Sequence, residues 1–364
     1  FEGEIAGLAI ALRIVLRAQK PWWLSTVLVA LAIGLTFLIS ASLIRWAGAN
    51  PLFAFKYMLL SPLQSTFGIT EAILAATPLV LTGGAVALAF RAGYWNIGAE
   101  GQLLAGAIAT TWVGLHATNW PHWLGILAVT LAGALGGASW AFIPAVLRSR
   151  LGIDEVVTTL LLNPVALLLV TGLLNGPWRN PETKFPESAI LAESIYFPKV
   201  ISGRIHLGLI IGIALLISCW WIVGRTAGGL KMRAVGLAPG AARIAGLKVE
   251  KTLFTTALAS GAIAGVAGAS EVAGVAHQLT DGISPGFGYT GVVVATLAAL
   301  SFPAVFFVAT VLGIINVGSF SASRALSIPS TIGEVVQAVL LTTVVGALVF
   351  LKYRFVRDRS GARD

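Results

Sequence analysis

Long apolar runs, separated by short polar connections, dominate the chain. Ten of these runs suit a transmembrane α-helix, which needs about 20 residues. They lie at 22–44, 70–90, 101–118, 122–147, 155–174, 207–224, 252–275, 286–301, 304–320 and 332–351. The runs are continuous rather than alternating, which argues against a transmembrane β-barrel. We therefore expect an all-α polytopic membrane protein of about ten transmembrane helices, with residues 1–364 forming a single transmembrane domain.

Composition supports this class. Hydrophobic residues make up 57% of the chain, charged residues 11%, and the mean hydropathy is +0.89. Globular domains carry roughly 25% charged residues. The net charge of +9 would suggest nucleic acid in a soluble protein, but the basic residues here fall mainly in short loops. We interpret them as topology determinants beside membrane lipids and expect no nucleic-acid partner.

The distribution of lysine and arginine predicts the orientation. With ten spans, 17 of the 24 basic residues fall on the side that carries both termini. Because basic loops stay inside, we expect both termini in the cytoplasm. Residues 1–20 then form a short amphipathic helix on the membrane. The connection 175–206 is extracytoplasmic, and the basic connection 225–251 is cytoplasmic.

One stretch interrupts the apolar pattern more than any other. Residues 90–103 read FRAGYWNIGAEGQL, with helix-like apolar sequence on both sides. Irregular backbone at membrane depth is tolerated only where it is buried in protein or lines a wet cavity. A loose counterpart, DGISPGFGY, occupies 281–289 and is compatible with two repeated halves. We interpret both breaks as parts of a solute pathway.

Polar residues within apolar sequence are candidates for lining that pathway, because intramembrane charges usually face a bundle interior or a water-filled path. In the first break, an aromatic ring beside an amide suits a ring-shaped solute with polar edges. Structural packing is the alternative for every residue in the set. The candidates are Trp95, Asn96, Glu100, Gln102, Asn163, Glu271, Phe287 and Tyr289.

Polar residues in three of the apolar runs can be interpreted further, two of the sets in two ways. Glu155, Thr159 and Asn163 are spaced i, i+4, i+8 and share one helix face, for interhelical hydrogen bonds or for solute. Glu271 lies among small residues that favour close helix packing, so it either lines the pathway or bonds to a neighbouring helix. Glu71, near a span end, is interpreted as solvated at the interface.

The basic loop 225–251 contains a short helix signal. Pro239 favours the first turn of a helix, the run 240–245 follows it, and Gly246 ends it. Such a helix either covers the membrane surface or offers a surface on which a partner pushes.

The sequence contains no catalytic set. The four histidines lack metal-ligand spacing, so no metal is expected, and no Walker A motif occurs. The chain is therefore not expected to be an enzyme or to bind a cofactor. If ATP powers transport, another subunit hydrolyses it.

Three motifs together identify a family resemblance. GYWNIGAEGQLLAGA at 93–107, GIDEVVTTLLLN at 152–163 and KMRAVGLAPGAARIAGLKVEK at 231–251 resemble an ABC-transporter permease. The resemblance is to the importer group of ribose and branched-chain amino acid permeases, and within it to nucleoside uptake permeases. It extends from about residue 70 to 345; residues 1–69 match less clearly.

The resemblance implies partners and an energy source. It implies a second, different permease subunit, a cytoplasmic ATP-binding subunit with ATP and magnesium, and an extracytoplasmic solute-binding protein in a bacterial inner membrane. The stretch 236–246 resembles the coupling helix that docks on the ATPase. Its coupling residues would be Gly236, Leu237, Pro239, Ala242, Arg243 and Gly246.

Other functions stay open at this point. An ABC permease for simple sugars or amino acids fits the same motifs. An ion-coupled secondary transporter or channel would use Glu100 and Glu271 as ion sites. A membrane scaffold or enzyme subunit is disfavoured by the two polar breaks and by the lack of catalytic groups.

Overall fold

The computed structural model describes residues 12–16, 22–117, 119–200 and 203–357. These residues form two compact units, which we describe separately. One unit joins the N-terminal residues up to Ala54 with those from Leu326 onward. The other comprises Phe55–Ala325 and contains every residue of the two polar breaks and of the basic loop.

The first unit is a helix pair with a small sheet. Helix α1 (Trp22–Trp46) packs against α13 (Ile332–Lys352), and the hydroxyls of Thr36 and Thr343 meet across the pair at 2.7 Å. Strands β1 (Leu12–Leu16) and β2 (Tyr353–Arg357) pair antiparallel, Leu12 opposite Arg357 and Leu16 opposite Tyr353. The expected amphipathic helix over 1–20 is therefore wrong for residues 12–16, and the rest of it lies outside the described residues. The adjacent β-branched residues Ile14 and Val15 suit a strand.

The second unit is helical, with bounds that follow the predicted spans. It begins inside α2 (Pro51–Leu59) and continues with a 3₁₀ turn at Ser61–Gln64. The following helices are α3 (Thr66–Arg91), α4 (Ala99–His116), α5 (His122–Leu151), α6 (Glu155–Asn175), α7 (Leu207–Arg225), α8 (Ala227–Leu237), α9 (Pro239–Ile244), α10 (Val249–Glu271), α11 (Phe287–Leu297) and α12 (Phe302–Leu326). A second 3₁₀ turn lies at Glu193–Ile195, and a π-helical turn at Val272–Ala276 extends α10.

The polytopic α-helical class is confirmed. Within the described residues, six helices are long and apolar enough to cross a membrane, or seven if the broken pair Ala30–Trp46 and Pro51–Leu59 counts as one span. All ten predicted runs are helical, but the run 286–301 does not form a full span. Its helix, α11, has 11 residues, or about 16 Å, roughly half the hydrocarbon thickness. It ends in a turn in which Ala299 and Leu300 have φ of +47° and +60°.

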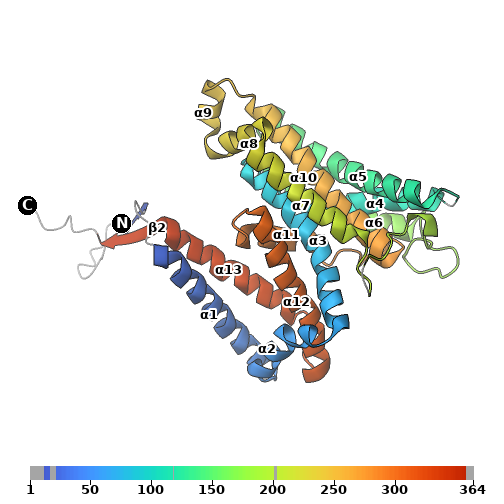
Figure 1. Cartoon of the computed structure of the whole chain (residues 1–364), viewed down its shortest axis with the longest axis horizontal. Helices are drawn as coiled ribbons and strands as arrows, with labels where there is room; N and C mark the ends of the chain where they lie inside the picture. Colours follow the sequence, from blue (N-terminus) through green and yellow to red (C-terminus); the bar gives the residue numbers. More distant parts are fainter. Residues whose placement is uncertain (1–11, 17–21, 118, 201–202, 358–364) are drawn as a thin grey trace, which may run out of the picture. The chain divides into compact units, whose positions relative to one another are not determined.

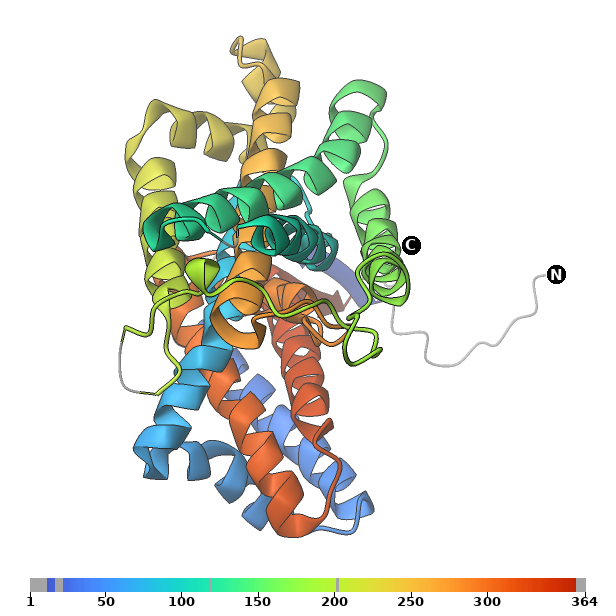
Figure 2. The same cartoon turned by 90° about the vertical axis from the view of Figure 1, so that its right-hand side faces the viewer.

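Small residues bring three helices of the second unit into backbone contact. Figures 1 and 2 show α4, α5 and α10 lying side by side. A Cβ atom on Gly265 would lie 2.1 Å from the carbonyl oxygen of Gly133, and one on Gly268 2.1 Å from that of Leu103. The close packing expected from the small residues of this run is therefore present. Helix α3, 83% buried over its apolar window, packs against α7, α10 and α11.

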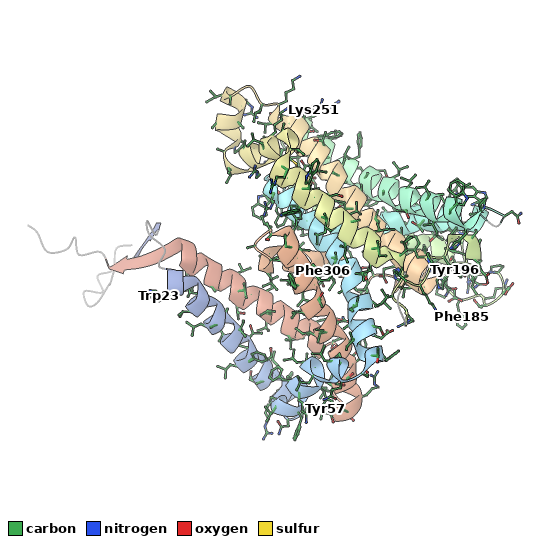
Figure 3. All side chains as sticks on the ribbon, in the orientation of Figure 1. Trp23, Tyr57, Phe185, Tyr196, Lys251 and Phe306 are labelled. Atoms are coloured by element: carbon green, nitrogen blue, oxygen red, sulfur yellow. The ribbon has the colours of Figure 1, made fainter. Side chains whose placement is uncertain are left out.

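The two long connections lie at opposite ends of the second unit. Figure 3 places Lys251, at the start of α10, far from Tyr196 in the 176–206 connection. Tyr196 stacks on His277, directly after the far end of α10, with ring centroids 3.8 Å apart. Between these ends the helix runs over Val249–Ala276, 28 residues, or about 42 Å, which exceeds the hydrocarbon thickness.

Candidate functional site

The break between α3 and α4 is fastened to one face of α6. The backbone N–H of Trp95 donates to the Glu155 carboxylate, and the N–H of Ile97 donates to the Thr159 hydroxyl, each at 3.2 Å. The other Glu155 oxygen pairs with the Arg148 guanidinium at 2.9 Å. Side chains thus satisfy backbone groups that a non-helical segment would otherwise leave unpaired.

Asn163 extends this contact by one more helical turn. Its side-chain oxygen accepts from the N–H of Gly101 at 2.9 Å, and its amide donates to the carbonyl of Ile97 at 3.0 Å. The shared face of Glu155, Thr159 and Asn163 is therefore used for hydrogen bonds to the first break and to the start of α4. All three side chains are buried, at 3% exposure or less.

Asn96 and Gln102 form a closed polar cluster inside the second unit. The Asn96 amide donates to the Gln102 oxygen at 2.8 Å and to the Ser260 hydroxyl at 2.9 Å, while Gln102 donates back to Asn96 at 3.0 Å. Ser260 in turn donates to the carbonyl of Ala85 at 2.7 Å. The cluster ties α3, α4 and α10 together, and Asn96 is 0% exposed. These contacts give both amides a structural role; contact with solute stays a prediction.

Trp95 is the exposed member of the first break. Its side chain is 52% exposed, and its ring lies against Phe90 with centroids 4.6 Å apart. An exposed indole supported by a second ring remains available for stacking on a planar group.

Glu100 joins the two breaks. Its carboxylate accepts the backbone N–H of Gly288 at 2.6 Å and lies beside Ser284, Gly286 and Tyr289, at the start of α11. Negative charge at a helix N-terminus is favourable because the first N–H groups lack helical partners. The loop before α11 and the start of α4, which sequence similarity related only weakly, are thus in direct contact.

Glu271 opens onto a cavity of about 350 Å³ in the second unit. Its side chain is 8% exposed and makes no hydrogen bond or ion pair within the described part of the chain. It directly precedes the π-helical turn at Val272–Ala276, and such turns occur frequently at functional sites. The cavity is lined by Phe67, Glu71, Leu74, Ala75, Pro78, Arg204, Glu271, Val275, Phe287, Asn316, Val317, Phe320 and Arg324.

The cavity brings together two of the residues predicted from the sequence and four polar residues not expected there. Glu271 and Phe287 were expected in the pathway, whereas Tyr289, 43% exposed, does not line this cavity. The unexpected polar members are Glu71, Arg204, Asn316 and Arg324. Glu71 and Arg204 pair with each other, Nε to Oε1 at 2.9 Å, although they lie 133 residues apart. No local sequence signal links such distant residues.

The loop over α8 and α9 has the predicted short helix. Helix α9 begins at Pro239 and ends at Ile244, and Gly246 follows with φ of +81°. Ala242 is buried against Val235 and Val249. Leu237 and Ile244 are 87% and 91% exposed at this end of the unit. Leu237 ends α8 and Ile244 ends α9, so the two helices together present exposed apolar side chains at this end, a surface suited to a protein partner.

The remaining predicted coupling residues shape this surface. The Arg243 guanidinium pairs with the Glu250 carboxylate at 2.5 Å, which ties α9 to the start of α10. Gly236 lies on the backbone just after α3, since a Cβ there would lie 2.2 Å from the carbonyl oxygen of Arg91 and 3.0 Å from the nitrogen of Gly93. The loop therefore contacts the first break directly.

A family model described as "Branched-chain amino acid transport system / permease component" matches residues 68–345. This range agrees with the extent of the resemblance expected from the sequence. It contains both polar breaks, every lining residue of the Glu271 cavity except Phe67, and the α8–α9 loop.

Curated proteins match over most of the chain. The guanosine ABC transporter permease protein NupP of Bacillus subtilis is 32% identical over 80% of this chain and 84% of the relative. The nucleoside ABC transporter permease protein NupB of Lactococcus lactis subsp. cremoris is 31% identical over 86% and 88%. The glucose ABC transporter permease protein TsgB13 of Haloferax volcanii is 32% identical over 95% and 94%.

Proposed function

The chain belongs to the permease-component family of branched-chain amino acid transport systems, and from that premise we propose that it carries nucleosides as the membrane subunit of an ATP-driven importer. Members of this family are membrane subunits of transporters, which supports a permease role for this chain. Two relatives named for guanosine and for nucleosides support the solute class.

The observation that carries the solute assignment is the cavity at Glu271. An intramembrane carboxylate without an internal partner marks a transport pathway, because burying it unpaired is costly. In the proposal, its oxygens accept hydrogen bonds from sugar hydroxyls or from base N–H groups. Phe287 and Phe320 supply apolar surface for a planar base. The volume of about 350 Å³ lies within the range of small-molecule sites, about 300–1,000 Å³.

The energy comes from a partner. Members of this family work with ATPase and solute-binding proteins in general. In the proposal, a cytoplasmic ATP-binding subunit holding ATP and magnesium docks on Leu237 and Ile244 at the α8–α9 surface. A second, different permease subunit and an extracytoplasmic binding protein that delivers solute at the 176–206 end complete the assembly.

Movement then passes from the loop to the pathway. ATP binding closes the ATPase dimer and displaces α9, and the Gly236 backbone moves the segment after α3, which contains the first break. Because that break is fastened to α6 and, through Glu100, to α11, the helices around it move together. The cavity opens outward to receive solute, and hydrolysis resets it.

Sugar transport is the second candidate, supported by the glucose permease relative that matches 95% of this chain. The Glu271 carboxylate and the Asn316 amide, which both line the cavity, suit the hydroxyls of a sugar as well as the polar groups of a nucleoside. The aromatic rings favour the nucleoside, because a base offers a flat apolar face. An ion-coupled mechanism is disfavoured by the family and by Glu100, whose carboxylate is already engaged at the start of α11.

Uptake into proteoliposomes tests the proposal. The assembled transporter, with its ATPase and binding protein, is supplied with guanosine, uridine, ribose, glucose or leucine, with and without ATP. We expect ATP-dependent uptake of nucleosides, lost in Glu271→Gln and retained in Glu334→Gln, an exposed acid in the first turn of α13. Uptake of glucose or leucine in place of nucleosides would refute the solute class. Uptake that needs an ion gradient and no ATP would refute the mechanism.

A further inference from the structure

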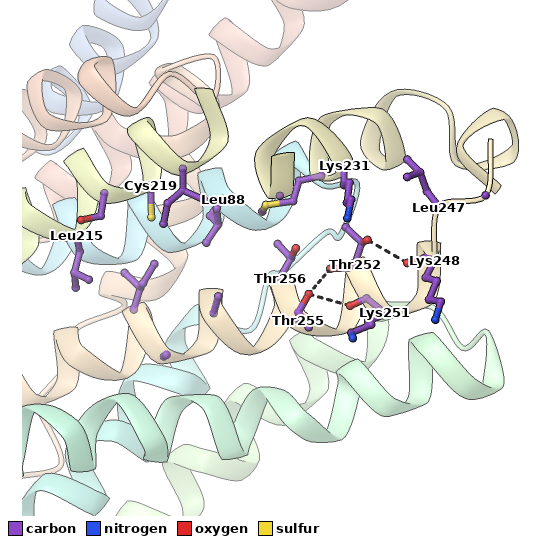
Figure 4. A pocket seen from close by; sticks show the side chains of 18 residues that line it. Leu88, Leu215, Cys219, Lys231, Leu247, Lys248, Lys251, Thr252, Thr255 and Thr256 are labelled. Carbon is purple, nitrogen blue, oxygen red and sulfur yellow. Dashed lines mark hydrogen bonds between the residues drawn. The ribbon is translucent and has the colours of Figure 1, made fainter. Parts of the chain in front are cut away.

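A second cavity lies at the α8–α9 end of the second unit, and none of the predicted pathway residues lines it. It has a volume of about 750 Å³ and is bordered by α7, α8 and α10 (Figure 4). Its outer part carries Lys231, Lys248 and Lys251, and none of the described residues that line it is acidic. Its inner part is apolar, with Leu215, Ile222 and Ile263 among the lining side chains.

This arrangement matches the position of a membrane–water boundary. Helix α7 ends at Arg225 and α10 begins at Val249, so the lysines lie where two apolar helices meet the basic loop. Figure 4 shows Lys231 extending from α8 toward Thr252 on α10. The lysines thus lie at the ends of two apolar helices, where lipid headgroups are expected, and the apolar wall continues from them along α7 and α10.

Hydroxyl groups carry no charge, and two of those that line the cavity already donate within α10. Thr252 donates to the carbonyl of Lys248 at 3.1 Å, and Thr255 donates to that of Lys251 at 2.9 Å. Their protons are engaged within α10, so the three lysines supply the binding charge. A ligand that fits both parts needs a compact anionic head and an apolar tail.

We propose that this cavity holds an anionic phospholipid, with its phosphate at Lys231, Lys248 and Lys251 and an acyl chain along the wall of α7 and α10. Charge complementarity selects this occupant, since basic pockets between transmembrane helices bind anionic headgroups. Assignment to the cytoplasmic leaflet rests on the proposed function, which places the α8–α9 loop inside; the site itself does not depend on it. A bound lipid would contact the same loop that receives the ATPase.

Native mass spectrometry tests the site on the full-length chain with its co-purifying subunits. The sample is delipidated and titrated with phosphatidylglycerol, with phosphatidylethanolamine, or with inorganic phosphate. We expect saturable binding of phosphatidylglycerol, weakened in the triple variant Lys231→Gln, Lys248→Gln, Lys251→Gln. At about fivefold per lysine, the loss is on the order of a hundredfold. The matched control Arg150→Gln, Arg225→Gln, Arg233→Gln removes equal charge from residues that do not line the cavity and should bind normally.

A second variant separates a lipid from a free anion. Ala262→Leu fills part of the apolar wall and leaves the lysines unchanged. It should weaken phosphatidylglycerol binding without changing phosphate binding. The proposal would be overturned if the two triple variants weakened binding equally, or if phosphatidylglycerol and phosphatidylethanolamine bound equally well. It would also be overturned if inorganic phosphate alone accounted for the anion bound in the cavity. A partner subunit that cross-links to Cys219, which lines the wall, would also overturn it.

Discussion

The carboxylate of Glu100 accepts a hydrogen bond from the backbone N–H of Gly288 at 2.6 Å. These residues are 188 positions apart and belong to the two places where the apolar pattern is broken. A Cβ atom on Gly288 would lie 2.1 Å from the nitrogen of Glu100, so the two backbones are in direct contact. The first turns of α4 and α11 are therefore in direct contact, and Glu100 of α4 caps the N-terminus of α11.

Removing the Glu100 carboxylate should weaken this contact between α4 and α11. Glu100→Ala leaves buried N–H groups of α11 without an acceptor, at a cost of about 1–3 kcal/mol. We expect a lower unfolding temperature and lower uptake for the purified transporter. Glu100→Gln keeps one acceptor oxygen and should retain more stability than Glu100→Ala. If Glu100→Ala unfolds like the wild type, the carboxylate does not hold α11.

The contact between α6 and the first break gives a second prediction. Thr159→Val removes the acceptor of the Ile97 N–H in a buried position, again at about 1–3 kcal/mol. Thr158 is its matched control, because its hydroxyl bonds only to the backbone of its own helix. We expect thermal unfolding of Thr159→Val to shift down, and that of Thr158→Val to stay near the wild type. Equal shifts would remove this hydrogen bond from the account.

Two substitutions in the first break should have different effects, one on stability and the other on transport. Asn96→Ala breaks a buried cluster and should lower the unfolding temperature, with a loss on the order of 1–3 kcal/mol. Trp95→Ala removes a half-exposed ring and should lower uptake while assembly and unfolding temperature change little. Both variants are measured in the same proteoliposome and thermal assays. Normal uptake in Trp95→Ala would exclude its ring from the pathway.

The α8–α9 surface gives a prediction about assembly. Ile244→Asp places a charge on a side chain that the ATPase is proposed to bury, at a cost of about 1.5–3 kcal/mol. We expect ATPase co-purification to weaken by roughly 10- to 100-fold. Ile190→Asp is the control, since Ile190 is 71% exposed in the opposite connection. If the ATPase still binds Ile244→Asp and solute-stimulated hydrolysis persists, the docking surface lies elsewhere.

The elements of the second unit were predictable because their signals are local. Apolar length placed the helices, the i, i+4, i+8 spacing placed Glu155, Thr159 and Asn163 on one face, and Pro239 with Gly246 bounded α9. The turn after α11 was not predictable. Ala299 and Leu300 adopt left-handed backbone without glycine, asparagine or aspartate to signal it.

The site was predictable only in part, because its contacts join distant segments. Asn96 bonds to Gln102, six residues along the chain, but its bond to Ser260 spans 164 residues and carries no local sequence signal. Glu71 was expected to be solvated at the interface, but it pairs with Arg204 at the edge of the cavity. Only Glu271 and Phe287 carried a sequence signal and also line this cavity.

A buried histidine at the 176–206 end gives a pH prediction. His206 is 1% exposed, its Nδ1 accepts the N–H of Gly208 at 3.1 Å, and its Nε2 has no hydrogen-bond partner among the described residues. Burial, aided by nearby His277, lowers the pKa of His206 to about 4. The unfolded chain keeps the ordinary pKa of about 6.5, so it binds the proton more readily than the folded chain.

Stability from this group is therefore fully present above about pH 6.5 and is lost as pH falls toward about 4, with a total on the order of 3 kcal/mol. His206→Asn keeps an acceptor for the Gly208 N–H but does not titrate, so its unfolding temperature should fall less between pH 7 and 4.5. His122→Asn, at an exposed histidine, should follow the wild type. Parallel curves for the wild type and His206→Asn would show that another group, such as the neighbouring His277, whose pKa burial also lowers, sets the acid limit.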